Sequence, residues 1–254
     1  MRGFSLVELS IVLVILGLLT GGILAGRSLI RASELRAVST EHSRWITATR
    51  AFQDKYLGLP GDLTNATGFW GKDATNCNSH TGTAATNGVC NGNGNGLLQI
   101  AGSPASWGEQ LQYWRHLAAA GLIEGTYTGL AGSGANNEAL LGVNSPISKL
   151  SSAGWGVWQS SDHAGSSNAF AYQYGNTLVF GAQNPANPPH AAILKPEEAW
   201  NIDTKLDDGK PATGKLMAYR RGTCTNSTSA TDTASDYLLT SDTIGCALFF
   251  PKVF

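Results

Sequence analysis

A carboxylate stands at the edge of the longest apolar segment of the sequence. Glu8 comes directly before Leu9–Gly26, in which 18 consecutive residues carry no charge. At ~1.5 Å rise per residue, this is about the minimum length for a helix that crosses a membrane. An ionised side chain at the membrane edge is costly unless another charge neutralises it. Glu8 therefore needs a charged partner, and this need is the first clue to what the chain does.

A second acidic group lies near the C-terminus, in the segment 202–211 with the sequence IDTKLDDGKP. Its carboxylates are those of Asp203, Asp207 and Asp208. Hard oxygen ligands of this kind suit Ca²⁺, and a structural calcium ion is one interpretation of the segment. The other is an ordinary Asp-Gly turn, whose acids are neutralised by the two lysines of the same segment. We favour the turn and therefore predict no cofactor.

The Gly/Asn repeat at 91–96 (NGNGNG) resembles the first half of a calcium-binding loop, with oxygen ligands at positions 1, 3 and 5 and glycine at position 6. The acid required at position 12 is replaced by Gly102, and all three candidate ligands are neutral. We therefore expect a tight turn here rather than a calcium site.

Four cysteines provide the next chemistry to consider: Cys77, Cys90, Cys224 and Cys246. The sequence has no CxxC motif and no histidine at zinc-finger spacing, which argues against a metal site. An even number of cysteines behind an export-type N-terminus favours two disulfides. Of the three possible pairings, we favour the two local ones, Cys77 with Cys90 and Cys224 with Cys246.

Nucleophilic catalysis finds little support. The histidines are scattered, at His42, His80, His116, His163 and His190. The run Ser160–His163 (SSDH) contains the residue types of a catalytic triad, but neighbours in sequence rarely reach triad geometry. We expect no enzyme activity.

Composition excludes two further classes of protein. The chain has 254 residues, of which 42% are hydrophobic and only 14% charged, against about 25% charged in typical soluble domains. It is therefore neither a charged disordered chain nor a nucleic-acid binder that relies on broad positive charge. The first 50 residues carry six arginines and three glutamates, a net +3, while the rest carries −4, which together give −1.

Beyond Arg31, apolar side chains recur every three or four residues and predict an amphipathic helix. The stripe consists of Leu35, Val38, His42, Trp45, Thr49, Phe52 and Tyr56. His42 in such a stripe is expected to be a packed residue rather than a ligand. The sequence Leu59-Pro60-Gly61-Asp62 ends the helix, because proline disfavours the α conformation in the residue before it. One helix of ~80 Å is therefore expected from about Phe4 to Tyr56.

The rest of the chain predicts a mixed domain with long loops, in which residues 125–167 have no regular structure. Ser106 and Glu109 suggest a capping box at the start of a helix that ends near Gly121. A second helix is expected to begin at 195–200, where proline stands near the first helical position. The expected strands are a hairpin over 168–183 that turns at Gly175-Asn176, and two strands at 215–221 and 244–250. A helix against a small antiparallel sheet is an α+β arrangement.

Three interpretations of the N-terminus compete. A cleaved secretory signal peptide is compatible with Ile23-Leu24-Ala25 as a cutting site, but it leaves Glu8 awkwardly placed. A plain membrane anchor gives Glu8 no function. The sequence Gly3-Phe4-Ser5-Leu6-Val7-Glu8 before an apolar segment resembles the class III signal of type IV pilins and type II secretion pseudopilins. We favour this third interpretation.

The resemblance implies specific processing and assembly. A prepilin peptidase would cut between Gly3 and Phe4, and Phe4 would be N-methylated. Glu8 of one subunit would then neutralise the Phe4 ammonium of a neighbour, since an unpaired charge in hydrocarbon is costly. The implied segments are a leader (1–3), a transmembrane or filament-core helix (4–30), an amphipathic half of the stem (31–58) and a globular head (59–254).

The resemblance also implies a fold. It is the pilin-like α+β fold, in which a long N-terminal helix, transmembrane in its first half, packs on a small antiparallel sheet with long disulfide-tied loops. The pair Cys224–Cys246 would hold the last strand, as a C-terminal disulfide does in many pilins. Many pilins carry a proline inside the stem, whereas this segment has glycines instead. We expect them either to loosen the helix on packing or to allow close helix contacts; they are Gly17, Gly21, Gly22 and Gly26.

The function implied is structural. The chain would be a subunit of a type IV pilus-like filament, stored in the inner membrane and then polymerised at the cell surface. Its partners would be copies of itself, the prepilin peptidase and the ATPase platform that assembles pili. The alternatives are a type II secretion or competence pseudopilin in the periplasm, a minor tip pilin or adhesin, and a ligand-binding head for which the stem is only a mount.

Overall fold

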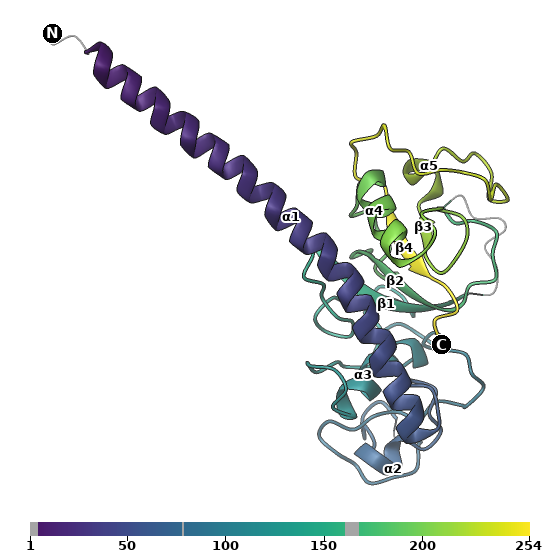
Figure 1. The fold of residues 1–254 in the computed structure, drawn as a ribbon. Helices are drawn as coiled ribbons and strands as arrows, with labels where there is room; N and C mark the ends of the chain where they lie inside the picture. The colour runs from purple at the N-terminus through teal and green to yellow at the C-terminus, as the bar shows by residue number, and fades with distance from the viewer. Residues whose placement is uncertain (1–4, 78, 161–167) are drawn as a thin grey trace.

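Helix α1 (Leu6–Tyr56) dominates the computed structural model, which describes residues 5–77, 79–160 and 168–254. The helix has 51 residues and projects far beyond the head, which packs against its C-terminal half (Figure 1). It continues without a break through the four glycines of the apolar segment, and a Cβ built at any of them would meet nothing within 4 Å. The head is an α+β domain, so the whole has the expected pilin-like arrangement.

The C-terminal half of α1 carries the buried stripe that the sequence predicts. Val38, Trp45, Thr49 and Phe52 are buried against the head. The helix ends at Tyr56, and the next residue, Leu57, adopts a left-handed conformation with φ 55° and donates its N–H to the carbonyl of Gln53. The chain therefore leaves the helix three residues before Pro60.

A tight turn follows α1 and leads into the short helix α2 (Ala66–Trp70). Gly61 has φ +86°, and a Cβ at this position would lie 2.2 Å from the carbonyl oxygen of Glu109. Only glycine fits here, because both the conformation and the close approach exclude a side chain. The turn thereby brings the end of the stem against helix α3 (Glu109–Ala119).

In the described part of the chain, four strands form one antiparallel sheet. Its spatial order is β1-β2-β4-β3, and the strands are β1 (Ala153–Ser160), β2 (Gly175–Ala182), β3 (Met217–Tyr219) and β4 (Ala247–Phe250). One face of the sheet, with Trp155, Phe180 and Leu248, shares the main core with residues of α1 and α3. The other face, with Val179 and Phe249, covers a second apolar cluster.

The predicted hairpin at Gly175-Asn176 is wrong. Gly175 begins strand β2, which pairs with β4 and with β1. Strand β1 lies in a segment for which the sequence predicts only loop. Phe170 and Tyr174 are not on a paired strand; they pack into the second apolar cluster. Their aromatic alternation therefore reflects packing onto one face of the sheet and not a strand within it.

Both helices that the sequence predicts in the head are present, but one cap differs. The capping-box interpretation of Ser106 and Glu109 is wrong, because α3 begins at Glu109 with Gly108 as its N-cap. The Ser106 hydroxyl bonds to the backbone of Ser103, and Glu109 accepts hydrogen bonds from the amides of a distant loop. Helix α4 (Pro196–Leu206) starts at proline as predicted, and the four-residue helix α5 (Arg221–Cys224) follows β3.

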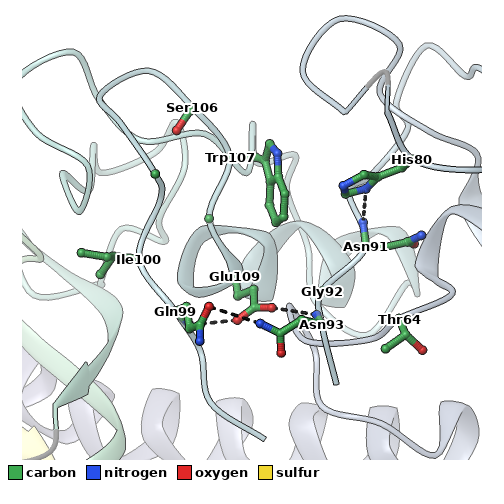
Figure 2. Close-up of a pocket in the computed structure, with 12 residues that line it drawn as sticks. Thr64, His80, Asn91, Gly92, Asn93, Gln99, Ile100, Ser106, Trp107 and Glu109 are labelled. Carbon is green, nitrogen blue, oxygen red and sulfur yellow. Dashed lines mark hydrogen bonds between the residues drawn. The ribbon is translucent and has the colours of Figure 1, made fainter. Parts of the chain in front are cut away.

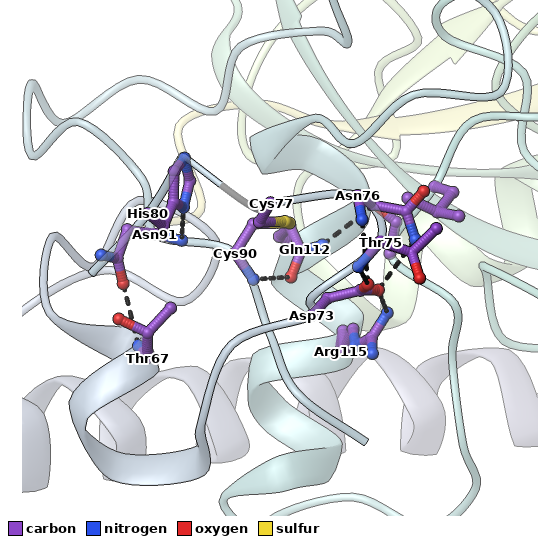
Figure 3. Close-up of a disulfide and its surroundings, with 12 residues drawn as sticks. Thr67, Asp73, Thr75, Asn76, Cys77, His80, Cys90, Asn91, Gln112 and Arg115 are labelled. Atoms are coloured by element: carbon purple, nitrogen blue, oxygen red, sulfur yellow. Dashed lines mark hydrogen bonds and ion pairs between the residues drawn. A yellow bond between two sulfur atoms is a disulfide. The ribbon is translucent and has the colours of Figure 1, made fainter. Parts of the chain in front are cut away.

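The cysteines form the two local pairs that the sequence favours. Cys77 and Cys90 have their Cα atoms 5.5 Å apart, and Cys224 and Cys246 have theirs 4.8 Å apart. The first disulfide lies in the loops around α2 and close to the ion pair of Asp73 with Arg115 (Figure 3). The second joins α5 to the residue directly before β4.

Candidate functional site

Glu8 lies in the first turn of α1, on an exposed surface. Its Oε2 accepts a hydrogen bond of 2.8 Å from the amide of Ser5, the residue that caps the helix. This bond satisfies one of the amides that a helix leaves unpaired at its start. The expected processing site, Gly3 and Phe4, lies outside the described residues. The structure therefore places Glu8 at the helix start and leaves its pairing with Phe4 a prediction.

On both sides of Glu8, the apolar N-terminal half of α1 is exposed all around. A helical segment of this length and composition is able to cross a membrane, and none of its most apolar 18-residue window is buried in the chain. An exposed apolar surface of this extent is a site for membrane or protein contact. The large apolar side chains of this surface are at least half exposed: Leu6, Val7, Leu9, Ile11, Val12, Leu13, Val14, Ile15, Leu16, Leu18, Leu19, Ile23, Leu24, Leu29 and Ile30.

Arg31 marks the point at which the head begins to contact the stem. Its Nε and one terminal nitrogen donate to the two carboxylate oxygens of Glu198 on α4, at 2.6 and 2.7 Å. The same guanidinium donates to the carbonyl of Ile193 at 3.3 Å. Burial alone would raise the pKa of Glu198, but the hydrogen bond from Arg31 and the amide of Lys195 hold it below its usual value. Glu198 is therefore an ionised partner for the stem at neutral pH.

A second carboxylate attaches the stem to the sheet. Glu41 is 9% exposed and accepts three hydrogen bonds, each of 2.7 or 2.8 Å. The donors are the hydroxyl of Ser148, the amide of Lys149 and the indole Nε1 of Trp155 on β1. The predicted stripe of α1 leaves Glu41 out, so sequence reasoning missed this residue. The available signal was spacing, since Glu41 lies three residues after Val38 and four before Trp45.

His42 is a packed residue, as the sequence suggests. Its ring stacks on Phe250 with centroids 4.3 Å apart, and burial lowers its pKa to about 4. His116 is fully buried beneath the end of the stem, where Nδ1 accepts from the amide of Gly61 and Nε2 contacts the carbonyl of Cys90. The suggested triad residues Ser161–His163 lie outside the described residues.

The three C-terminal acids lie together, as a shared site requires. Asp203, Asp207 and Asp208 each offer an oxygen within 4.8 Å of the others. All three are also bonded within the chain: Asp203 to the hydroxyl of Tyr237, Asp207 to the amides of Lys215 and Leu216, and Asp208 to the amide of Lys210 and the hydroxyl of Thr213. These hydrogen bonds explain, without a bound cation, why the three acids lie together in a turn. Nothing here tests the calcium interpretation, so the favoured turn without a cofactor stays a prediction.

The Gly/Asn repeat is folded around two carboxylates from elsewhere in the chain. Asp62 accepts from the amides of Gly94 and Gly96 at 2.6 and 2.7 Å. Glu109 accepts from the amides of Asn93 and Gln99 at 2.8 and 3.0 Å. The loop thus points backbone donors inward, which suits an anion and fits the expected turn.

These features define a class of protein: an α+β head fixed to a long helix whose exposed first half can enter a membrane. Comparison with known families adds a specific finding. Residues 1–24 match the model of the prokaryotic N-terminal methylation motif, which is the class III signal of type IV pilins and pseudopilins. No curated protein and no solved structure matches the chain. The motif and the apolar helix together fit a membrane-anchored precursor.

Proposed function

We propose that the chain is a structural subunit of a type IV pilus-like extracellular filament. It is made as an inner-membrane prepilin, cut between Gly3 and Phe4, methylated on Phe4 and polymerised through its stem. The observation that carries the proposal is the exposed apolar half of α1 beginning at Glu8, in the segment that matches the methylation motif. The partners are copies of the chain, the prepilin peptidase and the ATPase platform that assembles pili.

Glu8 sets the register between neighbouring stems in this proposal. An ionised carboxylate has about four acceptor positions, and the amide of Ser5 takes one of them. Glu8 can therefore keep its place at the helix start while it binds the Phe4 ammonium of a neighbour. Because two unpaired charges in an apolar surrounding are each costly, their pairing favours one axial position of the stems over all others.

The orientation of the head relative to the stem is fixed, because the two are joined at several points. The Arg31–Glu198 ion pair holds α4, and the three hydrogen bonds of Glu41 hold β1 and the segment before it. A hydrogen bond of 2.5 Å between Thr49 and Tyr113 holds α3. Charged and buried contacts of this kind fix orientation. A register chosen by the stems would thereby fix the spacing of the heads along the filament.

The proposal is tested by shearing cells and taking a mass spectrum of the N-terminal peptide in the released fraction. We expect a peptide that starts at N-methylated Phe4. Intact Met1 found only in membranes would contradict the proposal, as would a mature N-terminus near Gly26. Released filaments that increase with expression would support a shaft subunit. Processed protein that stays in the periplasm would instead identify a pseudopilin.

A further inference from the structure

A cleft of about 560 Å³ opens in the loops that surround the C-terminal end of the stem (Figure 2). Its volume falls in the range of about 300–1,000 Å³ that is usual for small-molecule sites. The loops and the start of α3 that carry its lining residues lie far from the apolar half of α1 (Figure 1), so a membrane or a filament core formed by that half would leave it free. Its main lining side chains are His80, Asn91, Asn93, Gln99, Trp107 and Glu109.

Two rings form one wall of the cleft. Trp107 and His80 meet edge to face, with centroids 5.1 Å apart and an interplanar angle of 80°. Trp107 is half-buried, so the rest of its indole surface is available to a ligand. An aromatic ring fixed at the rim of a polar cleft is a platform for a flat, partly apolar molecule.

The side-chain oxygens of two amide residues in the cleft already accept hydrogen bonds from other parts of the chain. The side-chain oxygen of Asn91 accepts from the amide of Thr67, and that of Gln99 accepts from the side chain of Asn93. Nδ1 of His80 accepts from the amide of Asn91, so the neutral ring carries its hydrogen on Nε2. Among the described residues, no acceptor is found for Nε2 of His80, Nδ2 of Asn91, Nε2 of Gln99 or Nε1 of Trp107.

The cleft is held in shape before any ligand arrives. Glu109, 3% exposed, anchors the amides of Asn93 and Gln99 on its floor. The disulfide of Cys77 with Cys90 brings together His80 and Asn91, which lie close to its two cysteines in the sequence (Figure 3). A preformed site avoids the cost of ordering its side chains on binding.

These observations exclude two kinds of ligand and favour a third. The described lining residues include no lysine or arginine, and the carboxylate of Glu109 repels anions. A purely apolar ligand would leave the free N–H donors without partners, which is costly. A neutral molecule with many oxygen acceptors and one apolar face satisfies both conditions.

We propose that this cleft binds a neutral carbohydrate, with the apolar face of one sugar ring on the indole of Trp107. Hydroxyl, ring or acetamido oxygens of the sugar accept hydrogen bonds from His80, Asn91 and Gln99. The donors select by position, because a ligand that lacks a matching oxygen would cover a donor and leave it unpaired. The inference does not depend on filament assembly, since the cleft lies wholly within the head.

The test uses the purified full chain in a detergent without sugar groups, such as lauryldimethylamine oxide. The probes are galactose, mannose, N-acetylglucosamine, N-acetylgalactosamine and their disaccharides, with inorganic phosphate and sialic acid as anionic comparisons. Binding is measured by saturation-transfer NMR and by tryptophan fluorescence. We expect at least one neutral sugar to bind with a Kd of about 1 mM or tighter.

Variants locate the binding. We expect Trp107→Ala to weaken it about tenfold and Gln99→Ala, at an exposed position, about threefold. Trp200→Ala is the matched control, because Trp200 is a partly exposed tryptophan on α4 outside the cleft, and it should leave the Kd unchanged. Circular dichroism establishes that each variant is folded. Binding of anions alone, no binding to any probe, or full affinity in folded Trp107→Ala and Gln99→Ala would each overturn the proposal.

Discussion

The guanidinium of Arg31 donates hydrogen bonds of 2.6 and 2.7 Å to the two carboxylate oxygens of Glu198, a residue 167 positions away in the sequence. Arg31 is the first residue after the apolar segment to bond to the head, and Glu198 also caps α4 by accepting from the amide of Lys195. The pair therefore joins the start of α4 to the end of the exposed apolar segment of α1. Such a two-point contact restricts rotation as well as separation.

Removing this pair should loosen the head from the stem. We expect Arg31→Ala to lower the free energy of unfolding by about 1–2 kcal/mol, more than an exposed ion pair contributes, because the contact is bidentate and half-buried. The measurement is urea unfolding of the full chain in detergent micelles. Lys195→Ala is the control, since its pair with Asp242 is largely exposed and should contribute less than about 0.5 kcal/mol. If the two variants lost the same free energy of unfolding, the Arg31–Glu198 pair would stabilise the protein no more than an exposed ion pair does.

Glu41 should matter more than any exposed acid on the stem. Glu41→Ala leaves an indole, a hydroxyl and an amide without their acceptor, and we expect a loss of about 2–4 kcal/mol. Glu41→Gln keeps one acceptor oxygen and should lose about half as much. The comparison is Glu34→Ala, whose contact with Arg31 is long at 3.5 Å and should cost little. Similar unfolding free energies for Glu41→Ala and Glu34→Ala would show that the three hydrogen bonds do not stabilise the head.

The elements that sequence reasoning predicted are those defined by local signals. Helix α1 follows from spacing, and α4 from a proline at its first position. Strand β1 was missed because Gly154 and Gly156 are typical of loops. The structure needs them for close packing, since a Cβ at Gly154 would lie 2.2 Å from a methyl group of Leu141. Nothing local in the sequence states that requirement.

The residues of the candidate site also fall into two groups: those that a local sequence signal reveals and those that only the fold brings together. Glu8 could be singled out because its charge stands beside an apolar run, which is a local contrast. The groups that donate hydrogen bonds to Glu41 are separated from it by 107 to 114 positions in the sequence, so no local pattern could reveal them. Trp107 and His80 meet only because loops far apart in the sequence fold together, and the sequence shows merely that both residue types are present.

Acid should destabilise the head through His116. Burial lowers its pKa to about 4, and its Nδ1 already accepts from the amide of Gly61, so the folded state resists protonation there. The unfolded chain takes up this proton at about pH 6.5. Stability should therefore fall as the pH drops from about 6.5 to about 4, by up to about 3 kcal/mol for this group.

His42, with its pKa lowered to about 4, acts in the same direction. We expect His116→Gln to be less stable than the parent at pH 7 but to lose less on acidification. Unfolding free energies at pH 7 and pH 4.5 give the comparison. An unchanged acid slope in the variant would assign the effect to other groups.

Calcium should leave the stability of the chain unchanged. The acids Asp203, Asp207 and Asp208 already accept hydrogen bonds from amides and hydroxyls of their own loop, and a cation would have to compete with those donors. The test compares Tm in excess EDTA with Tm in 5 millimolar calcium, which is on the order of the weakest calcium-binding modules. A ligand that binds only the folded state raises Tm. A rise that disappears in Asp207→Asn would establish a structural calcium ion instead.

Glu8 gives the sharpest prediction about assembly. Glu8→Ala removes the only acid in the first 33 residues and, in the proposed assembly, leaves the Phe4 ammonium of a neighbouring stem without a partner in an apolar surrounding. Because a desolvated, unpaired charge costs several kcal/mol, we expect the protein in the sheared fraction to fall by more than about tenfold, while the amount in the membrane is maintained. Ser10→Ala, two residues further along the exposed part of α1, should assemble normally. Glu8→Asp keeps the charge on a shorter side chain and should assemble better than Glu8→Ala. Normal filament yield from Glu8→Ala would show that the register of the stems is set by apolar packing alone, and that the carboxylate serves only to cap α1 through the amide of Ser5.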